Sequence, residues 1–468
     1  MLCTIAALML LPALVDLADN HPGWKAFVAA SAVTFFAGGL LVLFAYDDNP
    51  PRIGVKEGFL LTTLAWAVLT VFSALPIYWH GFSYTDAYFE AMSGLTTTGA
   101  TVLTGLDTMT RGILLWRAML NGIGGLGIIV IAIIMLPFLR VGGMQLFQME
   151  SSDKSEKVLP RAFELTLATA GIFAGLVCTC ALLYIWFGMS GFDAICHALT
   201  TVATGGFANY DASFAHFEQP ELHWIATVFM ILGALPFVVY IKSVRGDTTA
   251  LWNDVQVRGF VVFIAFVSVI LAIWMIFSRN ITFVDALTLT AFNVTSVVTT
   301  TGYASDDYST WGTIGPGVFF LLMFVGGCSG STSGGIKIYR LQIAHMLTRS
   351  HFLHLISPNR VVTLTYNGRR LPADVPFSVV SFLAIYFAVV GLFAVIYAGM
   401  GLDLVTALSA SATALGNVGP GLGDIIGPAG NFVPLPDAAK WALAFQMMLG
   451  RLELFTVLVL FRPEFWRS

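Results

Sequence analysis

The sequence of 468 residues contains little charge. Asp, Glu, Lys and Arg make up 11% of it, whereas soluble globular domains carry about 25% charged residues. Several stretches of about 20 residues contain almost no charge, which is enough to cross a bilayer core roughly 30 Å thick. The composition therefore predicts an all-α polytopic membrane protein. Examples of these stretches are residues 26–46, 59–79, 112–138, 165–187, 259–277, 376–400 and 441–461.

Other absences narrow the range of functions. The net charge of −4 gives no basic excess, so the composition does not indicate a nucleic-acid partner. The five cysteines lie in or beside apolar or Gly-rich stretches without the spacing of a metal site, and we interpret them as small hydrophobic residues. Residues 1–18 lack a basic n-region and an A-x-A cleavage site, so we expect a further span that begins almost at Met1.

A stretch rich in Thr and Gly occurs four times along the chain. Each copy begins near an aspartate, continues as a helix-compatible run too short to cross a bilayer, and closes on a glycine. Such self-similarity indicates one structural unit that is used four times. The copies are residues 83–101, 191–209, 282–305 and 401–421. Their aspartates are Asp86, Asp193, Asp285 and Asp403, and their closing glycines are Gly99, Gly205, Gly302 and Gly419.

An apolar span precedes each short helix and another follows it, so the predicted unit is span, short pore helix, glycine turn, span. If the short helices re-enter the membrane without crossing it, all but six of the 23 lysines and arginines lie on one side. The positive-inside rule makes that side cytoplasmic, together with both termini. The predicted pore units are residues 59–139, 162–243, 257–350 and 374–462, and residues 1–46 hold two leading spans, 2–18 and 26–46.

Irregular backbone at membrane depth occurs only where it is buried in protein or lines a water-filled cavity. Four glycine turns that meet on one axis can aim backbone carbonyls at it, and rings of carbonyls replace the hydration shell of a permeating cation. The C-terminal ends of the short helices would add partial negative charge there. Thr98, Thr204 and Thr301 directly precede the closing glycines and can brace the loops. Asn417 and Val418 take that place in the fourth copy.

Five motifs together resemble one known family. The stretches "GLTTTGATV", "TVATGGFA", "TTTGYASDDY" and "NVGPGLG" are similar to the four filter loops of the Trk/Ktr/HKT superfamily of potassium transporters. The stretch "GGCSGSTSGGIK" at 326–337 is similar to an intramembrane loop in the third unit of that family. The two leading spans fit the bacterial TrkH branch, and the resemblance covers nearly the whole chain.

The resemblance implies a channel-like subunit for K⁺ uptake, with K⁺ as the permeating ion and no cofactor in this chain. It implies that the loop 326–335 and Arg451 close the pore below the filter. It also implies a homodimer in the bacterial inner membrane that docks on a cytosolic ring of nucleotide-binding regulatory subunits of the TrkA type. The implied filter residues are Thr97, Thr98, Gly99, Thr204, Gly205, Thr301, Gly302, Asn417, Val418 and Gly419. The implied gate residues are Gly326, Gly327, Gly330, Gly334, Gly335 and Arg451.

Several alternatives stay open at this point. A sodium-permeable member of the superfamily is one, and residue 99 discriminates, because serine there resembles a sodium-favouring signature whereas this chain has Gly99. A secondary carrier would show twofold repeats with broken spans. A membrane-embedded enzyme would need clustered His, Glu or Cys, and the eight histidines are scattered. The sequence leaves open the coupling to protons or sodium, the role of His197, and a pairing of Arg117 with Glu90.

Overall fold

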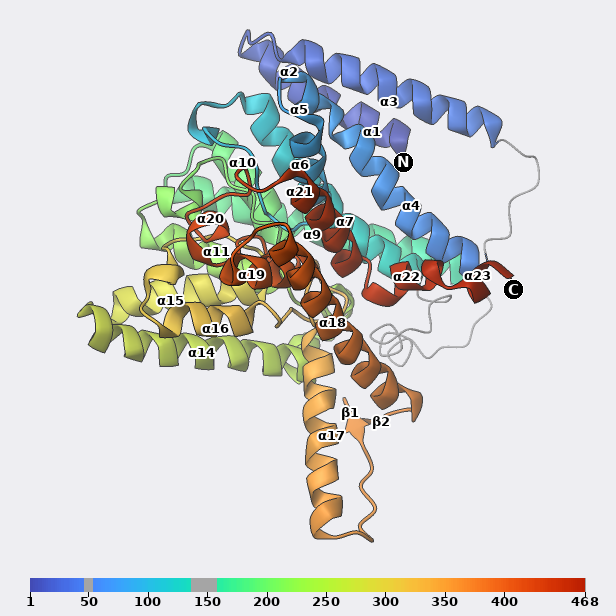
Figure 1. The fold of residues 1–468 in the computed structure, drawn as a ribbon, viewed down its shortest axis with the longest axis vertical. Coiled ribbons are helices and arrows are strands. Elements are labelled where there is room, and N and C mark those ends of the chain that lie inside the picture. Colours follow the sequence, from blue (N-terminus) through green and yellow to red (C-terminus); the bar gives the residue numbers. More distant parts are fainter. Residues whose placement is uncertain (46–53, 136–157, 468) are drawn as a thin grey trace.

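The computed structural model describes residues 1–45, 54–135 and 158–467, and helices dominate it (Figure 1). Within these ranges six helices are long and apolar enough to cross a membrane, or up to eight if each of two bent helix pairs is one span. The chain is therefore a helical polytopic membrane protein, as the composition predicts. The predicted end of the first unit, residues 136–139, lies outside the described residues.

The order long helix, short helix, long helix occurs four times, and we refer to these segments as units 1 to 4. Unit 1 contains α4 (Val55–Ser73), α5 (Leu75–Trp79), α6 (Tyr84–Leu95), η1 (Leu106–Thr108) and α7 (Arg111–Met135). Unit 2 contains α9 (Val158–Trp186), α10 (Gly191–Val202), η2 (Ser213–His216), α11 (Pro220–Gly233) and α12 (Phe237–Val244).

Units 3 and 4 follow the same order. Unit 3 contains α13 (Ala250–Asn253), α14 (Val255–Arg279), α15 (Phe283–Val298), η3 (Tyr308–Thr310), α16 (Ile314–Leu322) and α17 (Ile338–Ile356). An antiparallel hairpin of β1 (Thr365–Tyr366) and β2 (Arg369–Arg370) connects it to unit 4. Unit 4 contains α18 (Asp374–Gly399), α19 (Leu404–Gly416), α20 (Gly423–Ile426), α21 (Asp437–Arg451), α22 (Leu454–Leu458), η4 (Val459–Phe461) and α23 (Pro463–Arg467).

The N-terminal helices pack beside unit 1. The helices α1 (Leu2–Leu8) and α2 (Leu10–Ala18) form one apolar stretch shorter than the full spans, and α3 (Trp24–Phe44) is a full span. Asp16 of α2 is fully buried and accepts a hydrogen bond of 2.7 Å from the Gly112 N–H at the start of α7. This bond ties the leading helices to unit 1.

The units close into a ring through their short helices, α6, α10, α15 and α19. Helix α10 packs against α7 of unit 1, α15 against α11 of unit 2, and α6 against α21 of unit 4. Units 1 and 4 are therefore neighbours although they lie at opposite ends of the sequence. In Figure 1 the helices α6, α10 and α19 lie toward the middle of the molecule, and α17 projects from it together with β1 and β2.

Second helices in three units are interrupted, whereas the sequence predicts continuous spans in units 2 and 4. Helices α11 and α12 meet at 91°, and α21 meets the following helix at 113°. In unit 2 the break precedes Pro236, whose missing N–H and fixed φ disfavour a continuous helix. In unit 4 the break lies at Glu453, which adopts a φ of 58°. In unit 3, residues 323–337 separate α16 from α17.

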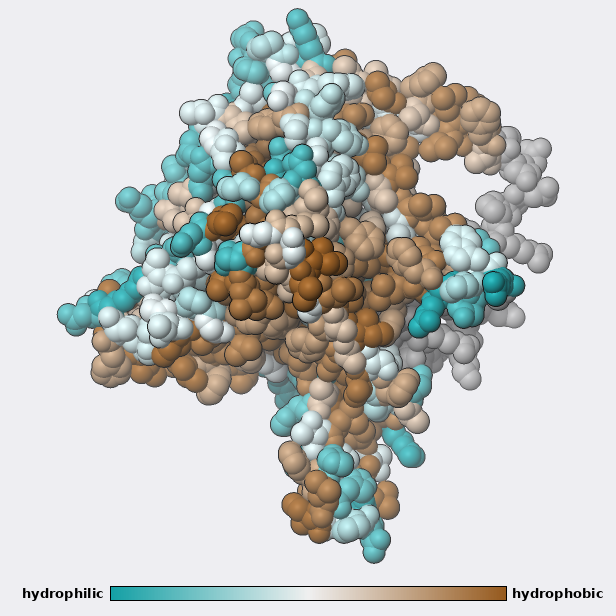
Figure 2. Space-filling model, in the orientation of Figure 1, coloured by the Kyte–Doolittle hydropathy of each residue, from teal (hydrophilic) through white to brown (hydrophobic). Residues whose placement is uncertain are grey.

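The surface carries the apolar band that a membrane requires. In Figure 2 hydrophobic residues gather across the middle of the face, over α4 and α18, and hydrophilic residues gather at the top and upper left. Large side chains on the spans are exposed, among them Phe36 of α3 at 68% and Phe266 of α14 at 63%. Exposed apolar surface of this extent is unusual in a soluble monomer and fits contact with lipid.

The short helices begin with capped ends, in two ways. In units 1 to 3 a Ser or Thr is the N-cap, and its side chain accepts a hydrogen bond from the backbone N–H of the predicted aspartate. In unit 4 the aspartate itself, Asp403, is the N-cap and accepts from Val405 and Thr406 at 3.1 Å. The pairs in units 1 to 3 are Ser83 with Asp86, Ser190 with Asp193, and Thr282 with Asp285.

We expect Asp403→Ala to destabilise the start of α19. Hydrogen bonds from the side chain and backbone of Thr406 and from the Val405 N–H lower the pKa of Asp403. Its contribution to stability is therefore present above the pKa of the unfolded chain and is lost as the pH falls through the lower pKa of the folded state. At neutral pH the loss should be about 1 kcal/mol, measured as faster amide hydrogen exchange at Val405 and Thr406.

Asp403→Asn is the matched control, because an asparagine side chain caps without a charge. We expect the protection of these amides, relative to unstructured amides at the same pH, to stay near that of the wild type at neutral pH and to remain unchanged on acidification. Equal protection of these two amides in Asp403→Ala and in the wild type at neutral pH would contradict the capping role.

Candidate functional site

All four short helices end in the same backbone turn. The residue after the last helical turn adopts a left-handed conformation, and its N–H donates to the carbonyl three residues earlier in the chain. The N–H of the next residue donates to the carbonyl five residues earlier. This pattern is the Schellman motif, which satisfies carbonyls at a helix end. Threonine and asparagine replace the usual glycine at the left-handed position. The residues are Thr97 (φ 50°), Thr204 (φ 50°), Thr300 (φ 57°) and Asn417 (φ 55°), and all four are fully buried.

A glycine with positive φ follows two residues after each left-handed residue. These glycines are Gly99 (φ 82°), Gly206 (φ 71°), Gly302 (φ 87°) and Gly419 (φ 110°). In the second loop the structural equivalent of Gly99 is therefore Gly206, whereas the sequence analysis aligned Gly205. The register differs by one residue because two glycines follow Thr204, and the Thr-Gly pair alone does not show which of them turns the backbone.

The four loops meet edge to edge around one axis. A β-carbon added to each of these glycines would collide with the backbone carbonyl of the next unit, and after unit 4 the sequence of contacts returns to unit 1. At Gly99 the distance would be 2.5 Å and at Gly419 2.7 Å. Only glycine fits such a close approach. The contacts pair Gly99 with the carbonyl of Gly205, Gly206 with that of Thr301, Gly302 with that of Val418, and Gly419 with that of Thr98.

Side chains brace this carbonyl ring from behind. The hydroxyls of Thr96 and Thr98 lie 2.8 Å apart, and those of Thr299 and Thr301 show the same distance. In the fourth loop Asn417 replaces a hydroxyl and donates from Nδ2 to Thr98 Oγ1 at 3.0 Å. The first and fourth loops are thereby joined directly.

The intramembrane loop, residues 323–337, is held by the broken span of unit 2. The N–H groups of Cys328 and Thr332 donate to the carbonyls of Ala234 and Gly233, which are free because α11 ends there. The Phe237 N–H at the start of α12 donates to the Gly330 carbonyl at 2.9 Å. The break and the loop therefore satisfy each other's backbone groups, as irregular backbone at membrane depth requires.

The intramembrane loop also packs against three of the four left-handed residues. Thr300 Oγ1 accepts from the Gly334 N–H at 2.7 Å, and Thr204 Oγ1 donates to Thr332 Oγ1 at 3.1 Å. A β-carbon on Gly334 would meet the carbonyl of Gly416 at 2.6 Å and the β-carbon of Asn417 at 3.0 Å. The loop thus lies against the ends of the short helices in units 2, 3 and 4. Its other glycines, Gly326, Gly327 and Gly335, form its two ends, where the Gly326 N–H donates to the Ile336 carbonyl.

Arg451 is the last residue of α21 and completes the contact to unit 1. Its side chain is only 3% exposed, and it donates to the Thr332 carbonyl at 2.6 Å and to the Gly124 carbonyl at 3.4 Å. In the predicted span of residues 441–461 this arginine would lie midway. In the structure it stands at a helix C-terminus, where the helix dipole favours a cation.

Two cavities flank this arrangement. One is lined by Gly99, Gly206 and Gly302 of the carbonyl ring and by Pro420. The other is lined by the intramembrane loop and by the charged side chains of Lys337, Arg340, Arg451 and Glu453. Arg340 forms an ion pair with Glu453, and the Lys337 amine donates to the Ser333 carbonyl. The carbonyl ring thus lines the first cavity, and the intramembrane loop lines the second.

A buried ion pair between Arg117 and Glu90 supports the first loop. The sequence left this pairing open. Arg117 Nε lies 2.8 Å from Glu90 Oε1, and both side chains are at most 2% exposed. Arg117 Nη1 also donates to the Ala208 carbonyl of the second loop at 2.7 Å, and its guanidinium lies 4.2 Å from the centre of the Phe207 ring. His197 of α10 is fully buried with its Nδ1 2.8 Å from the Asp193 carbonyl, so it is a packed side chain.

Comparisons with known proteins agree with this arrangement. The chain is 47% identical to the Trk system potassium uptake protein TrkI of Halomonas elongata, over 99% of this chain and 94% of that protein. It is 36% identical to the Trk system potassium uptake protein TrkH of Escherichia coli K12, over 98% of this chain and 96% of that protein. These relatives are named as uptake proteins and not as enzymes.

Solved structures and family models give the same result. The crystal structure of the potassium transporter TrkH from Vibrio parahaemolyticus matches with a TM-score of 0.92 at 32% identity, covering 100% of this chain and 97% of that one. A family model described as TrkH, cation transport protein, matches residues 23–468. The chain belongs to the TrkH family of cation transport proteins.

Proposed function

We propose that this chain takes up K⁺ through a pore on the axis of the four loops, with the carbonyl ring as its selectivity filter. The observation that carries this proposal is the closed ring in which each glycine abuts the carbonyl of the next unit. Rings of backbone carbonyls are the known means of replacing the hydration shell of K⁺. The names of the relatives, which are potassium uptake proteins, support K⁺ as the ion.

The filter in this proposal uses the predicted residues with two additions, Gly206 and Thr300, of which Thr300 is the left-handed residue of the third loop. Gly206 joins it, because its backbone matches that of Gly99, and Gly205 supplies the carbonyl that Thr98 supplies in the first loop. The full set is Thr97, Thr98, Gly99, Thr204, Gly205, Gly206, Thr300, Thr301, Gly302, Asn417, Val418 and Gly419.

The intramembrane loop and Arg451 act as the gate in this proposal. The loop contacts the short-helix ends of units 2 to 4, and Arg451 fastens it by its bond to the Thr332 carbonyl. A buried positive charge below the filter also opposes the passage of a cation. Opening then requires the loop to leave the axis, and Gly326, Gly327, Gly330, Gly334 and Gly335 give it the freedom to do so.

Control by a partner completes the proposal. The relatives belong to a Trk system, and we propose a homodimer in the bacterial inner membrane that docks on a TrkA-type ring of cytosolic nucleotide-binding subunits. The projecting α17 and the hairpin β1–β2 would then face the cytosol, because Arg349, Arg360, Arg369 and Arg370 lie on them or beside them. Both termini lie on that side in this arrangement.

A Na⁺-permeable pore is the second candidate, and Gly99 argues against it. A β-carbon at this position would lie 2.5 Å from the Gly205 carbonyl oxygen, so a serine would displace a carbonyl of the ring. Gly99→Ser should therefore lower the ratio of K⁺ to Na⁺ flux into liposomes by about tenfold, which corresponds to roughly 1.4 kcal/mol of lost discrimination.

Gly105→Ser is the matched control for that variant. Gly105 is also left-handed (φ 73°), but a β-carbon there would meet only Thr108 Oγ1, at 3.8 Å. We expect its flux ratio to equal that of the wild type. Folded wild-type protein without K⁺ flux, even with the cytosolic partner present, would refute the pore.

Removing the charge of Arg451 should open the pore. We expect Arg451→Gln to raise K⁺ flux about tenfold without the partner, equivalent to roughly 1.4 kcal/mol of barrier. Arg451→Lys keeps the charge and should stay near the wild-type flux. If the arginine only holds the fold through its two carbonyl contacts, Arg451→Gln will instead lower the melting temperature and leave the flux of the folded protein unchanged.

A further inference from the structure

In every loop the segment that leads away from the short helix, which we call the outgoing limb, is hydrogen-bonded to a side chain of that helix. In each loop the fifth residue after the left-handed one donates its backbone N–H to an acceptor on the preceding short helix. Val102 donates to Glu90 Oε2 at 2.9 Å, Asn209 to His197 Nε2 at 3.5 Å, Ser305 to Asn293 Oδ1 at 3.2 Å, and Leu422 to Ser409 Oγ at 3.0 Å. We refer to Glu90, His197, Asn293 and Ser409 as the latch residues.

The latches lie at nearly the same place on their helices but differ in chemistry. Three of them precede the left-handed residue by seven positions, and Ser409 precedes it by eight. A carboxylate, an imidazole, an amide and a hydroxyl perform the same acceptor role in units 1 to 4. The donating residues are at most 9% exposed, so an N–H without this acceptor would lose its hydrogen bond in a site that water hardly reaches. Because each of the four equivalent amides has such an acceptor, we expect the four hydrogen bonds to have one structural role.

This role follows from the part of each loop that lies between the turn and the latch. The Schellman turn fixes the start of the loop, and the latch fixes the residue five places later. The carbonyls of Thr98, Gly205, Thr301 and Val418 lie between these points, on the ring. A loop that is held only at its start could rotate these carbonyls away from the axis, whereas one held at both ends cannot do so without breaking a buried hydrogen bond.

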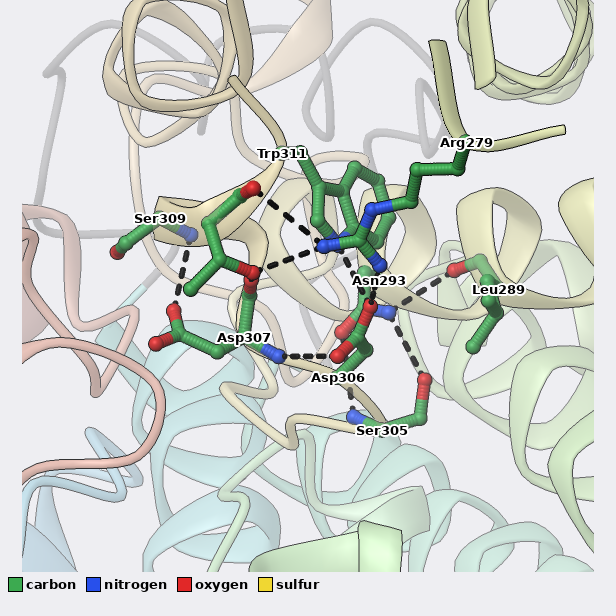
Figure 3. A network of polar contacts seen from close by, with 9 residues as sticks. Arg279, Leu289, Asn293, Ser305, Asp306, Asp307, Ser309 and Trp311 are labelled. Carbon is green, nitrogen blue, oxygen red and sulfur yellow. Dashed lines mark hydrogen bonds and ion pairs between the residues drawn. The ribbon is translucent and has the colours of Figure 1, made fainter. Parts of the chain in front are cut away.

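The surroundings of two latches reinforce them. Glu90 also accepts from Thr101 Oγ1 at 2.9 Å, and Arg117 fixes its carboxylate. Asn293 donates from Nδ2 to Ser305 Oγ at 2.8 Å and to the Leu289 carbonyl at 2.9 Å (Figure 3). The residue after Ser305, Asp306, is paired with Arg279 at 2.7 Å, so the outgoing limb of the third loop is held at two successive residues.

We propose that the four latch residues are positioning residues that set ion selectivity by holding the ring carbonyls in place, without contacting the ion. The proposal rests on the proposed pore function. The most economical test is Ser409→Ala, which removes one oxygen atom and leaves the Leu422 N–H without its acceptor.

Ser93→Ala is the matched control for this test. Ser93 is a fully buried serine on the short helix of unit 1, and its hydroxyl has no hydrogen-bond partner. The same atom is removed from the same kind of helix, but no latch is lost. Ser409→Thr keeps the hydroxyl and serves as the conservative variant.

The measurements use the purified full chain in liposomes, with the Arg451→Gln substitution in every variant if the wild type needs it to conduct. We expect Ser409→Ala to lower the ratio of K⁺ to Na⁺ flux about threefold to tenfold, the effect of one buried hydrogen bond on an equilibrium. Amide hydrogen exchange at Leu422 should accelerate in the same variant. Ser93→Ala should change neither quantity, and Ser409→Thr should restore both.

The outcomes separate the latch from the pore. A flux ratio in folded Ser409→Ala equal to that of the wild type would overturn the latch while leaving the pore intact. If Ser409→Ala does not fold, Asn293→Leu tests the same point in unit 3, with Thr295→Val as its control because the Thr295 hydroxyl has no partner. Absence of K⁺ flux in every folded chain, also with the cytosolic partner added, overturns the pore and the latch's role in selectivity together.

Discussion

The irregular segments at membrane depth that the structure describes share one constraint, which is that backbone polar groups there must be paired inside the protein. The four loops, the intramembrane loop and the bends in two long helices all leave regular structure where lipid offers no hydrogen bonds. Each of them finds partners in another irregular segment. The carbonyls that α11 leaves free at Gly233 and Ala234 take the N–H groups of Thr332 and Cys328, for example. The irregular segments therefore occur together, near the axis, and none of them could persist alone.

This mutual dependence limits what the sequence reveals. Long apolar runs predicted the helical membrane fold, and the four Thr-Gly stretches predicted the number and order of the short helices, because both are local signals. The bends at Pro236 and Glu453 were missed, because the two helices on either side of each bend together have the length and hydropathy of one span. The bend in unit 2 is stabilised by residues about a hundred positions later in the chain, and a local pattern carries no information about them.

The site shows the same division between local and distant determinants. Gly99, Gly302 and Gly419, which the sequence analysis named as closing glycines, have positive φ values, and none of them has another glycine directly beside it. The second loop was assigned one residue early, because Gly205 and Gly206 are equal as residues and only the end of α10 distinguishes them. The sequence analysis raised Glu90 only as a partner of Arg117 and left the role of His197 open. It gave no sign of a common role, since Glu90, His197, Asn293 and Ser409 share neither charge nor shape. What they share is that each accepts a hydrogen bond from the equivalent backbone N–H of its loop.

Backbone chemistry explains why the units could diverge so far in their side chains. A ring of carbonyls takes its charge from peptide groups, which are the same whatever residue supplies them. Thr98, Gly205, Thr301 and Val418 can therefore occupy equivalent places, and the fourth loop can replace Thr-Thr by Asn-Val without losing its carbonyl. The glycines have no such freedom, because a β-carbon on any of them would meet the carbonyl of the next unit. The geometry thus requires glycine at four positions, whereas different residues can supply the carbonyls of the ring. For this reason the glycines are the feature that the four repeats share most clearly.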